Sequence, residues 1–206
     1  MPDSFLSVTE VKGISPQRSP STQRESMSTQ KQGDGAPRLF YSTNSAFPAG
    51  HGFEIQQAES SQQISAVREL FLEYASSLNF SLCFQSFEKE LAGLPGDYAP
   101  PGGRLLLAAH SSQLAGCVAL HKLENEICEM KRLYVRPQFR GQGLGRILAE
   151  RVVADAREIG YKRLRLDTVE PVMRDAVALY RKLGFREIAP YRENPIAGAL
   201  YMELEL

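Results

Sequence analysis

The spacing of apolar positions separates a polar N-terminal segment from a patterned remainder. Residues 1–52 are rich in Ser, Thr, Gln and Pro and show no apolar periodicity, so they cannot bury enough surface to offset the entropy lost on ordering. From Phe53 to Ala58 apolar and polar residues alternate as in a strand, and from Ile64 to Leu78 apolar residues recur at helical spacing. The pattern predicts a disordered polar tail over residues 1–52 and one folded domain over residues 53–206.

The middle of the chain has the pattern of an antiparallel region, because short apolar runs are separated by polar turns. A Pro- and Gly-rich stretch at 94–103 is predicted to be a loop, and His110-Ser111-Ser112 the turn of a hairpin. The other predicted elements are a short helix between Ser86 and Leu91 and strands over Arg104–Ala109, Gln113–Leu120 and Ile127–Val135.

The C-terminal half has the pattern of a β-α-β unit. Helical periodicity runs from about Gly143 to Ile159, and Gly160 is expected to cap that helix. The strand Leu164–Thr168 must then lie parallel to Ile127–Val135, because a helix crosses between them. A helix over Arg174–Leu183, a strand over Phe185–Ile188, a loop over Pro190–Pro195 and a strand over Ala199–Leu206 follow. The sequence thus predicts a mixed α/β sheet flanked by helices.

Composition and charge narrow the class of protein. The 206 residues carry a formal net charge of zero, so there is no global electrostatic case for binding nucleic acid or an anionic membrane. The three cysteines form no C-x-x-C pair and the three histidines are scattered, which argues against a disulfide scaffold and a metal site. No apolar run approaches the ~18 residues of a membrane span. We expect a metal-free cytoplasmic protein, monomeric or homodimeric; the Ser/Thr-rich start leaves organelle targeting open.

A glycine-rich segment before the long helix carries the clearest chemical signal. The strand end Leu133-Tyr134-Val135 is stopped by Pro137, and Arg140-Gly141-Gln142-Gly143-Leu144-Gly145 leads into the helix. Backbone N–H groups can approach a ligand closely where glycines remove side chains, and the positive end of the helix dipole lies behind them. The segment predicts a cradle for a diphosphate, with Arg140 adding a positive charge at its edge.

Two common phosphate loops do not fit this segment. A P-loop needs Lys-Ser or Lys-Thr after its last glycine, and Arg146 follows Gly145 instead. A dinucleotide fingerprint needs glycine where Arg146 stands, although Asp167 lies at roughly the 20-residue distance expected of a ribose-binding acid. A Rossmann fold also needs several strand–helix units, whereas only one surrounds this loop.

The pattern that fits is [Arg/Gln]-x-x-Gly-x-[Gly/Ala] over residues 140–145, which resembles the acetyl-CoA pyrophosphate loop of the GNAT superfamily of N-acetyltransferases. A second segment, Ala176-Val177-Ala178-Leu179-Tyr180-Arg181-Lys182-Leu183-Gly184-Phe185, is similar to the family's Ala-x-x-Leu-Tyr-x-Lys-x-Gly-Phe block. The resemblance covers about Phe53 to Leu206. It implies a central splayed sheet, with the pantetheine of acetyl-CoA between the strands Ile127–Val135 and Leu164–Thr168.

The resemblance also implies which residues hold acetyl-CoA. The backbone of Leu133 and Val135 would bond the pantetheine amides and the thioester carbonyl. The family often has Asn seven residues before the tyrosine of its second block, and Met173 stands there instead, so that side-chain contact is absent. The implied cofactor-binding residues are Leu133, Tyr134, Val135, Arg140, Gly141, Gln142, Gly143, Leu144, Gly145, Met173 and Ala176.

Tyr180 is the first candidate for catalysis. It matches the tyrosine that commonly lies near the sulfur in this family and protonates the departing thiolate. A phenol with a pKa near ~10 suits that proton transfer. The alternative is a tyrosine that only packs in the helix face with Leu179 and Leu183.

Glu129 is the candidate general base. Family members that act on lysine side chains carry a strand glutamate at the matching place, and an amine with a pKa near ~10 needs a base or a water relay. Strict alternation would put Glu129 on the same side of its strand as Lys131, Leu133 and Val135. The alternative is an ordinary glutamate that faces solvent.

Acceptor recognition is expected from the variable segments, and Arg192 suggests an acceptor with a carboxylate. The candidate acceptor-binding residues are Tyr74, Phe80, Arg192 and Asn194. The sequence predicts an acetyl-CoA-dependent N-acetyltransferase in which a primary amine of a small molecule or peptide attacks the thioester directly. The alternative is an acyl-CoA-binding regulatory module without turnover, which Met173 favours and Tyr180 and Glu129 oppose.

Overall fold

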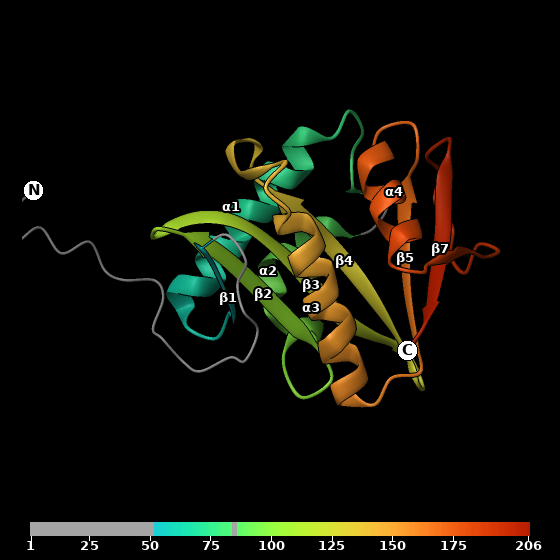
Figure 1. Ribbon diagram of the computed structural model, residues 1–206, viewed down its shortest axis with the longest axis horizontal. Helices are drawn as coiled ribbons and strands as arrows, with labels where there is room; N and C mark the ends of the chain where they lie inside the picture. Colours follow the sequence, from blue (N-terminus) through green and yellow to red (C-terminus); the bar gives the residue numbers. More distant parts are fainter. Residues whose placement is uncertain (1–51, 84–85) are drawn as a thin grey trace, which may run out of the picture. The chain divides into compact units, whose positions relative to one another are not determined.

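The computed structural model describes residues 52–83 and 86–206, so the disordered tail predicted over residues 1–52 lies outside the described residues apart from Gly52. Its strands are β1 (Phe53–Gln57), β2 (Arg104–His110), β3 (Gln113–Glu124), β4 (Ile127–Val135), β5 (Arg163–Val169), β6 (Arg186–Glu187) and β7 (Ala199–Glu205). Its helices are α1 (Ser61–Ser77), α2 (Phe87–Gly93), α3 (Leu144–Ile159) and α4 (Arg174–Lys182) (Figure 1). Within these ranges no helix is both long and apolar enough to cross a bilayer.

The strands form one mixed sheet in the order β1-β2-β3-β4-β5-β7-β6. β4 and β5 are parallel, and the other neighbouring strands are antiparallel. Helix α3 makes the crossover between β4 and β5, as a parallel pair requires. The mixed α/β sheet predicted from the sequence is confirmed.

Helices cover both faces of the sheet and bury two apolar clusters. One cluster lies under α3 and α4, and the other lies under α1 and α2; we call these faces the α3 side and the α1 side. β2 contributes to both, because Leu106 and Ala108 belong to the cluster on the α3 side and Leu105 and Leu107 to the cluster on the α1 side. Burial on both faces explains why the β2 sequence is an unbroken apolar run.

β4 and β5 diverge soon after they meet, and we call the diverging part the fork. They pair only at Ile127–Glu129 and Arg163–Arg165, three residues on each strand. Figure 1 shows the two strands together near the C-terminus and apart toward the ends that lead into the 3₁₀ turn Pro137–Phe139 and α4. The splayed pair of strands implied by the sequence resemblance is therefore present.

β4 contains a bulge at Arg132 and Leu133. Both residues lie opposite a single residue of β3, between the pairs made by Lys131 and Tyr134. Arg132 has a φ of 56°, a left-handed conformation that costs a residue with a side chain about 1–3 kcal/mol. A bidentate ion pair with Glu90 of α2, at 3.0 and 2.5 Å, stabilises Arg132 in this position.

The bulge changes which face the later residues of β4 occupy. Leu133 and Val135 pack on the α3 side and Tyr134 on the α1 side. Glu129 and Lys131 alternate with residues of the α3 cluster before the bulge, so they face the α1 side. The prediction that Glu129 shares a face with Leu133 and Val135 was wrong, because one extra residue reverses the alternation.

Candidate active site

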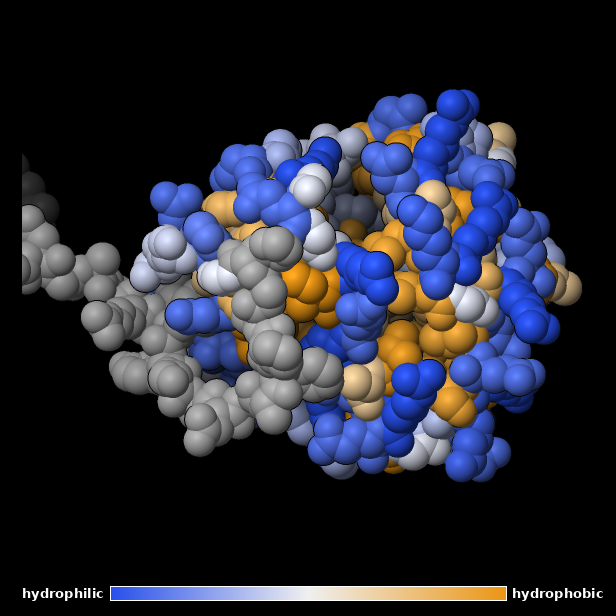
Figure 2. Space-filling model, in the orientation of Figure 1, coloured by the Kyte–Doolittle hydropathy of each residue, from blue (hydrophilic) through white to orange (hydrophobic). Residues whose placement is uncertain are grey.

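A pocket opens in the fork, between β4, β5, α1 and α4. In Figure 2 the surface is hollowed at this place, between α3 and α4. The pocket brings together seven of the residues predicted from the sequence: Tyr74, Phe80, Leu133, Met173, Ala176, Tyr180 and Asn194. It also contains residues that sequence reasoning missed, above all Lys131, Asp167 and Thr168. These three residues could have been identified only from the divergence of the two strands that carry them, which is a property of the tertiary structure and not of the local sequence.

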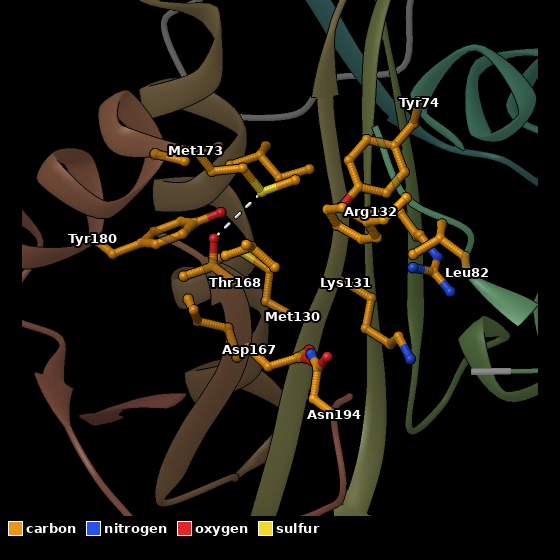
Figure 3. Close-up of a pocket in the computed structure, with 15 residues that line it drawn as sticks. Tyr74, Leu82, Met130, Lys131, Arg132, Asp167, Thr168, Met173, Tyr180 and Asn194 are labelled. Atoms are coloured by element: carbon orange, nitrogen blue, oxygen red, sulfur yellow. Dashed lines mark hydrogen bonds between the residues drawn. The ribbon is translucent and has the colours of Figure 1, made fainter. Parts of the chain in front are cut away.

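Tyr180 projects from α4 into this pocket (Figure 3). Its ring is buried and packs against Phe185 with centroids 5.7 Å apart. Its hydroxyl forms no hydrogen bond within residues 52–83 and 86–206, so it can donate to a ligand. Burial raises the pKa of Tyr180 above its usual 10, which keeps the phenol protonated at neutral pH. The side chain thus combines a packing role for its ring with an available proton.

Met173 stands at the N-cap of α4 and lines the pocket beside Tyr180. Its sulfur accepts a hydrogen bond from Thr168 Oγ1 at 3.3 Å (Figure 3). This contact fixes Met173 across the fork from β4. The Met173 thioether therefore gives the pocket an apolar surface at the position where the family often has the hydrogen-bonding side chain of Asn.

The glycine-rich turn lies outside the lining of the pocket, at the start of α3. Gly141 and Gly143 have φ values of 76° and 83°, and a Cβ built on either would meet nothing within 4 Å. In the described part of the chain, no acceptor is found for the backbone N–H groups of Gly141, Gln142 and Gly143. Unpaired donors beside open space at a helix N-terminus fit an anionic ligand such as a diphosphate.

Arg140 is held at the edge of this turn. Its Nε donates to the Val135 carbonyl at 2.9 Å, and its guanidinium lies 5.9 Å from the centroid of the Tyr134 ring. The charge is therefore fixed beside the turn. Of the predicted backbone pair, Leu133 lines the pocket and Val135 does not.

Glu129 is fully buried and lies outside the pocket lining. Its carboxylate accepts hydrogen bonds from Tyr191 Oη at 2.6 Å, from His121 Nε2 at 2.8 Å and from both terminal nitrogens of Arg192. Burial raises the pKa of Glu129, but the bond from His121 and the charges of Lys131 and Arg192 outweigh it and lower the pKa to about 2. A carboxylate with these partners is held in place and binds protons weakly, which is unfavourable for a general base.

Arg192 ties the two strands of the fork together. It pairs with Glu129 of β4 and with Asp167 of β5. Asn194 Nδ2 donates to the second oxygen of Asp167 at 3.0 Å. The loop after β6 thus fixes the Asp167 carboxylate at the pocket wall. Arg192 itself lies outside the pocket lining with its charge matched by two carboxylates, which leaves it poorly placed to bind the carboxylate of an acceptor.

Replacing Glu129 should change how stability depends on pH. The folded pKa of Glu129, about 2, is below its usual 4.5, so its contribution is complete above about pH 4.5 and is lost as pH falls toward 2. Glu129→Gln is expected to lower the free energy of unfolding at pH 7 by on the order of 3 kcal/mol and to remove this pH dependence. Urea unfolding at pH 7, 4 and 3 measures both effects.

The control for this variant is Glu187→Gln, which removes an exposed glutamate paired with Arg181. Exposed ion pairs contribute little, so its stability should follow that of the wild type at each pH. Equal pH dependence in Glu129→Gln and the wild type would show that Glu129 is not a stabilising carboxylate.

Acidic residues elsewhere do not form a metal centre in the part of the chain that the structure describes. Residues 52–83 and 86–206 contain no group of three or more His, Cys, Asp or Glu side chains that could hold a metal ion. Cys117 and Cys128 are buried and Cys83 is exposed, and all three are free thiols.

Comparison with known proteins agrees with this geometry. Residues 64–185 match the model of the acetyltransferase (GNAT) family. The chain is 39% identical over 148 residues to an uncharacterized N-acetyltransferase of Schizosaccharomyces pombe, a match that covers 70% of this chain and 90% of the relative. It is 30% identical over 202 residues to an uncharacterized N-acetyltransferase of Dictyostelium discoideum, covering 68% of this chain and 93% of the relative.

A solved structure shares the fold. It is a GNAT family acetyltransferase from Elizabethkingia anophelis with acetyl-CoA bound, which superposes with a TM-score of 0.56 at 23% identity and covers 76% of this chain and 100% of that one. The family model spans more than half of the chain, and the Schizosaccharomyces pombe relative is similar over most of its own length. The chain therefore belongs to the GNAT family of acetyltransferases.

Proposed function

We propose that the protein transfers the acetyl group of acetyl-CoA to a primary amine bound in the fork. The observation that carries the proposal is the pocket between the diverging strands, with the protonated Tyr180 phenol in its wall. Membership of the GNAT family and the acetyl-CoA bound in the Elizabethkingia anophelis protein support it.

Acetyl-CoA fits the donors that the chain offers. The N–H groups of the turn at 141–143 and the charge of Arg140 would hold the diphosphate. The fork would take the pantetheine arm, because β4 beyond Glu129 has no ladder partner in β5 and Leu133 lines the opening. This placement brings the thioester toward Tyr180.

The reaction needs two proton movements. The acceptor ammonium gives one proton to a carboxylate and from there to solvent, and the free amine nitrogen forms a bond with the thioester carbonyl carbon. The carbon–sulfur bond then breaks with its electron pair on sulfur, and the thiolate takes the Tyr180 proton. The nitrogen loses a second proton after it has bonded to the carbonyl carbon, and this proton returns Tyr180 to its protonated form. The products are the acetylated amine and the CoA thiol.

Asp167 replaces Glu129 as the proposed carboxylate for the amine. Asp167 lines the pocket, whereas Glu129 does not. Arg192 and Asn194 orient the Asp167 carboxylate at the pocket wall, where an ammonium in the pocket would meet its negative charge. In this proposal Glu129 acts indirectly, by holding Arg192.

The proposal is tested by measuring acetyl-CoA binding by calorimetry and release of CoA thiol with a panel of amines. We expect acetyl-CoA to bind and thiol release to require an amine, with one acetylated amine formed per thiol. Binding without release for any amine would support the acyl-CoA-binding regulatory module instead. Absence of binding would contradict both functions.

A further inference from the structure

Lys131 is a pocket-lining cation that forms no ion pair with any residue that the structure describes. Its side chain is half-buried and lines the pocket in the fork. Within residues 52–83 and 86–206 its ammonium forms no ion pair and no hydrogen bond. Burial lowers the pKa of Lys131, an effect that the nearby Glu129 only partly opposes. A half-buried ammonium that lacks a partner can gain one from a bound anion.

The carboxylates near Lys131 are already engaged by other cations. Glu90 forms its bidentate pair with Arg132, and Glu129 and Asp167 share Arg192. The three carboxylates and the three basic residues of this cluster, Lys131 included, sum to a formal charge of zero. A ligand that carries one charge of each sign would leave this balance unchanged.

Lys131 and Asp167 offer those two charges from opposite arms of the fork. Lys131 belongs to β4 and Asp167 to β5, and both line the same pocket without pairing with each other. In Figure 3 both lie in the lower half of the view with Asn194, whereas Tyr180 and Met173 lie to the upper left. Both charged side chains thus lie below the phenol in this view.

We propose that the acceptor is an amino acid, with its ammonium at Asp167 and its carboxylate at Lys131. This inference rests on the proposed acetyl transfer and adds the class of acceptor. The carboxylate role that the sequence suggested for Arg192 passes to Lys131, because Arg192 is already paired with two carboxylates.

A second cavity gives room for the rest of the acceptor. Lys131 lines it as well, together with Glu90, Tyr98 and His121. A molecule whose carboxylate reaches Lys131 therefore has space beyond it for a side chain. The polar lining of the second cavity favours a polar side chain.

The test compares amino acids with their own α-carboxamides, for example alanine, glutamate and lysine, at saturating acetyl-CoA. The amide keeps the amine and removes only the negative charge. Its amine is also less basic, so more of it is unprotonated at neutral pH, and chemistry alone favours the amide. We expect kcat/KM to be about 10- to 100-fold higher for the acid, the range of a hydrogen bond to a charged group.

Lys131→Met removes the ammonium and keeps most of the side chain length. It should reduce the acid-to-amide ratio of kcat/KM to about 1, through loss of activity on the acid, and leave the Kd for acetyl-CoA unchanged. Lys131→Glu should favour the amide. The control is Lys122→Met, which removes an exposed lysine of β3 and should keep the preference for the acid.

Each outcome decides the inference. An acid preference that is lost in Lys131→Met and kept in Lys122→Met supports it. Equal use of acid and amide by the wild type, or an acid preference retained by Lys131→Met, overturns it and leaves the proposed acetyl transfer standing. Failure of every amine to release thiol overturns the proposed function and this inference with it.

Discussion

Tyr180→Phe should lower kcat by about 10²- to 10⁴-fold, the usual contribution of a general acid. The substitution removes only the hydroxyl, so the ring contact with Phe185 remains and the fold should be kept. The hydroxyl has no hydrogen bond within the described residues that its loss would break. The Kd for acetyl-CoA should change little, because the diphosphate and pantetheine contacts proposed above are elsewhere. Steady-state thiol release and calorimetry measure the two quantities.

Tyr161→Phe is the matched control. Tyr161 is also a buried tyrosine, but its hydroxyl donates to the Gly102 carbonyl at 2.8 Å, away from the pocket. Its loss should cost about 1 kcal/mol of stability and leave kcat unchanged. If Tyr180→Phe has wild-type turnover, the residue is a packing tyrosine and the departing thiolate takes its proton from elsewhere.

Gly143→Glu should abolish measurable binding of acetyl-CoA, a loss of at least about 100-fold in affinity. The new side chain would occupy the open space in front of the turn and place a negative charge where the diphosphate is proposed to bind. The φ of 83° adds strain of about 1–3 kcal/mol, which the favourable position of a glutamate at a helix N-terminus partly offsets. Calorimetric titration with acetyl-CoA measures the loss.

Gly160→Glu is the control that distinguishes blocking of the diphosphate cradle from the effect of backbone strain. Gly160 caps the other end of α3 with a φ of 100°, and a Cβ there also meets nothing within 4 Å. The same substitution therefore introduces similar strain far from the turn, and binding should be retained. Acetyl-CoA affinity that is unchanged in Gly143→Glu would contradict the assignment of the turn as the diphosphate cradle.

Local pattern was sufficient to predict most of the fold. The apolar run of β2, the glycine that caps α3 and the crossover between β4 and β5 each follow from neighbouring residues. The motifs around Gly143 and Tyr180 are also local, so the sequence could supply candidate residues for both ends of the proposed site. These features depend on backbone geometry and on the helical or strand period, and both can be recognised within a short stretch of sequence.

The bulge at Arg132 could not be predicted in this way. Left-handed φ values usually require glycine, and here an arginine adopts one because Glu90, 42 residues earlier, pairs with it. The partners of Glu129 could not be predicted for a similar reason. Its partners Tyr191 and Arg192 lie 62 and 63 residues further along the chain, so no local pattern shows that its carboxylate is occupied.

The bulge also bears on how sequences with this site can diverge. Lys131, before Arg132, is proposed to face the acceptor, whereas Leu133, after it, is proposed to face the arm of the donor. On this proposal, substitution of Lys131 changes acceptor preference without altering the backbone that is proposed to meet the thioester. Deleting one residue at the bulge would exchange the two faces, so the site depends on the length of this strand as well as on the side chains that it carries.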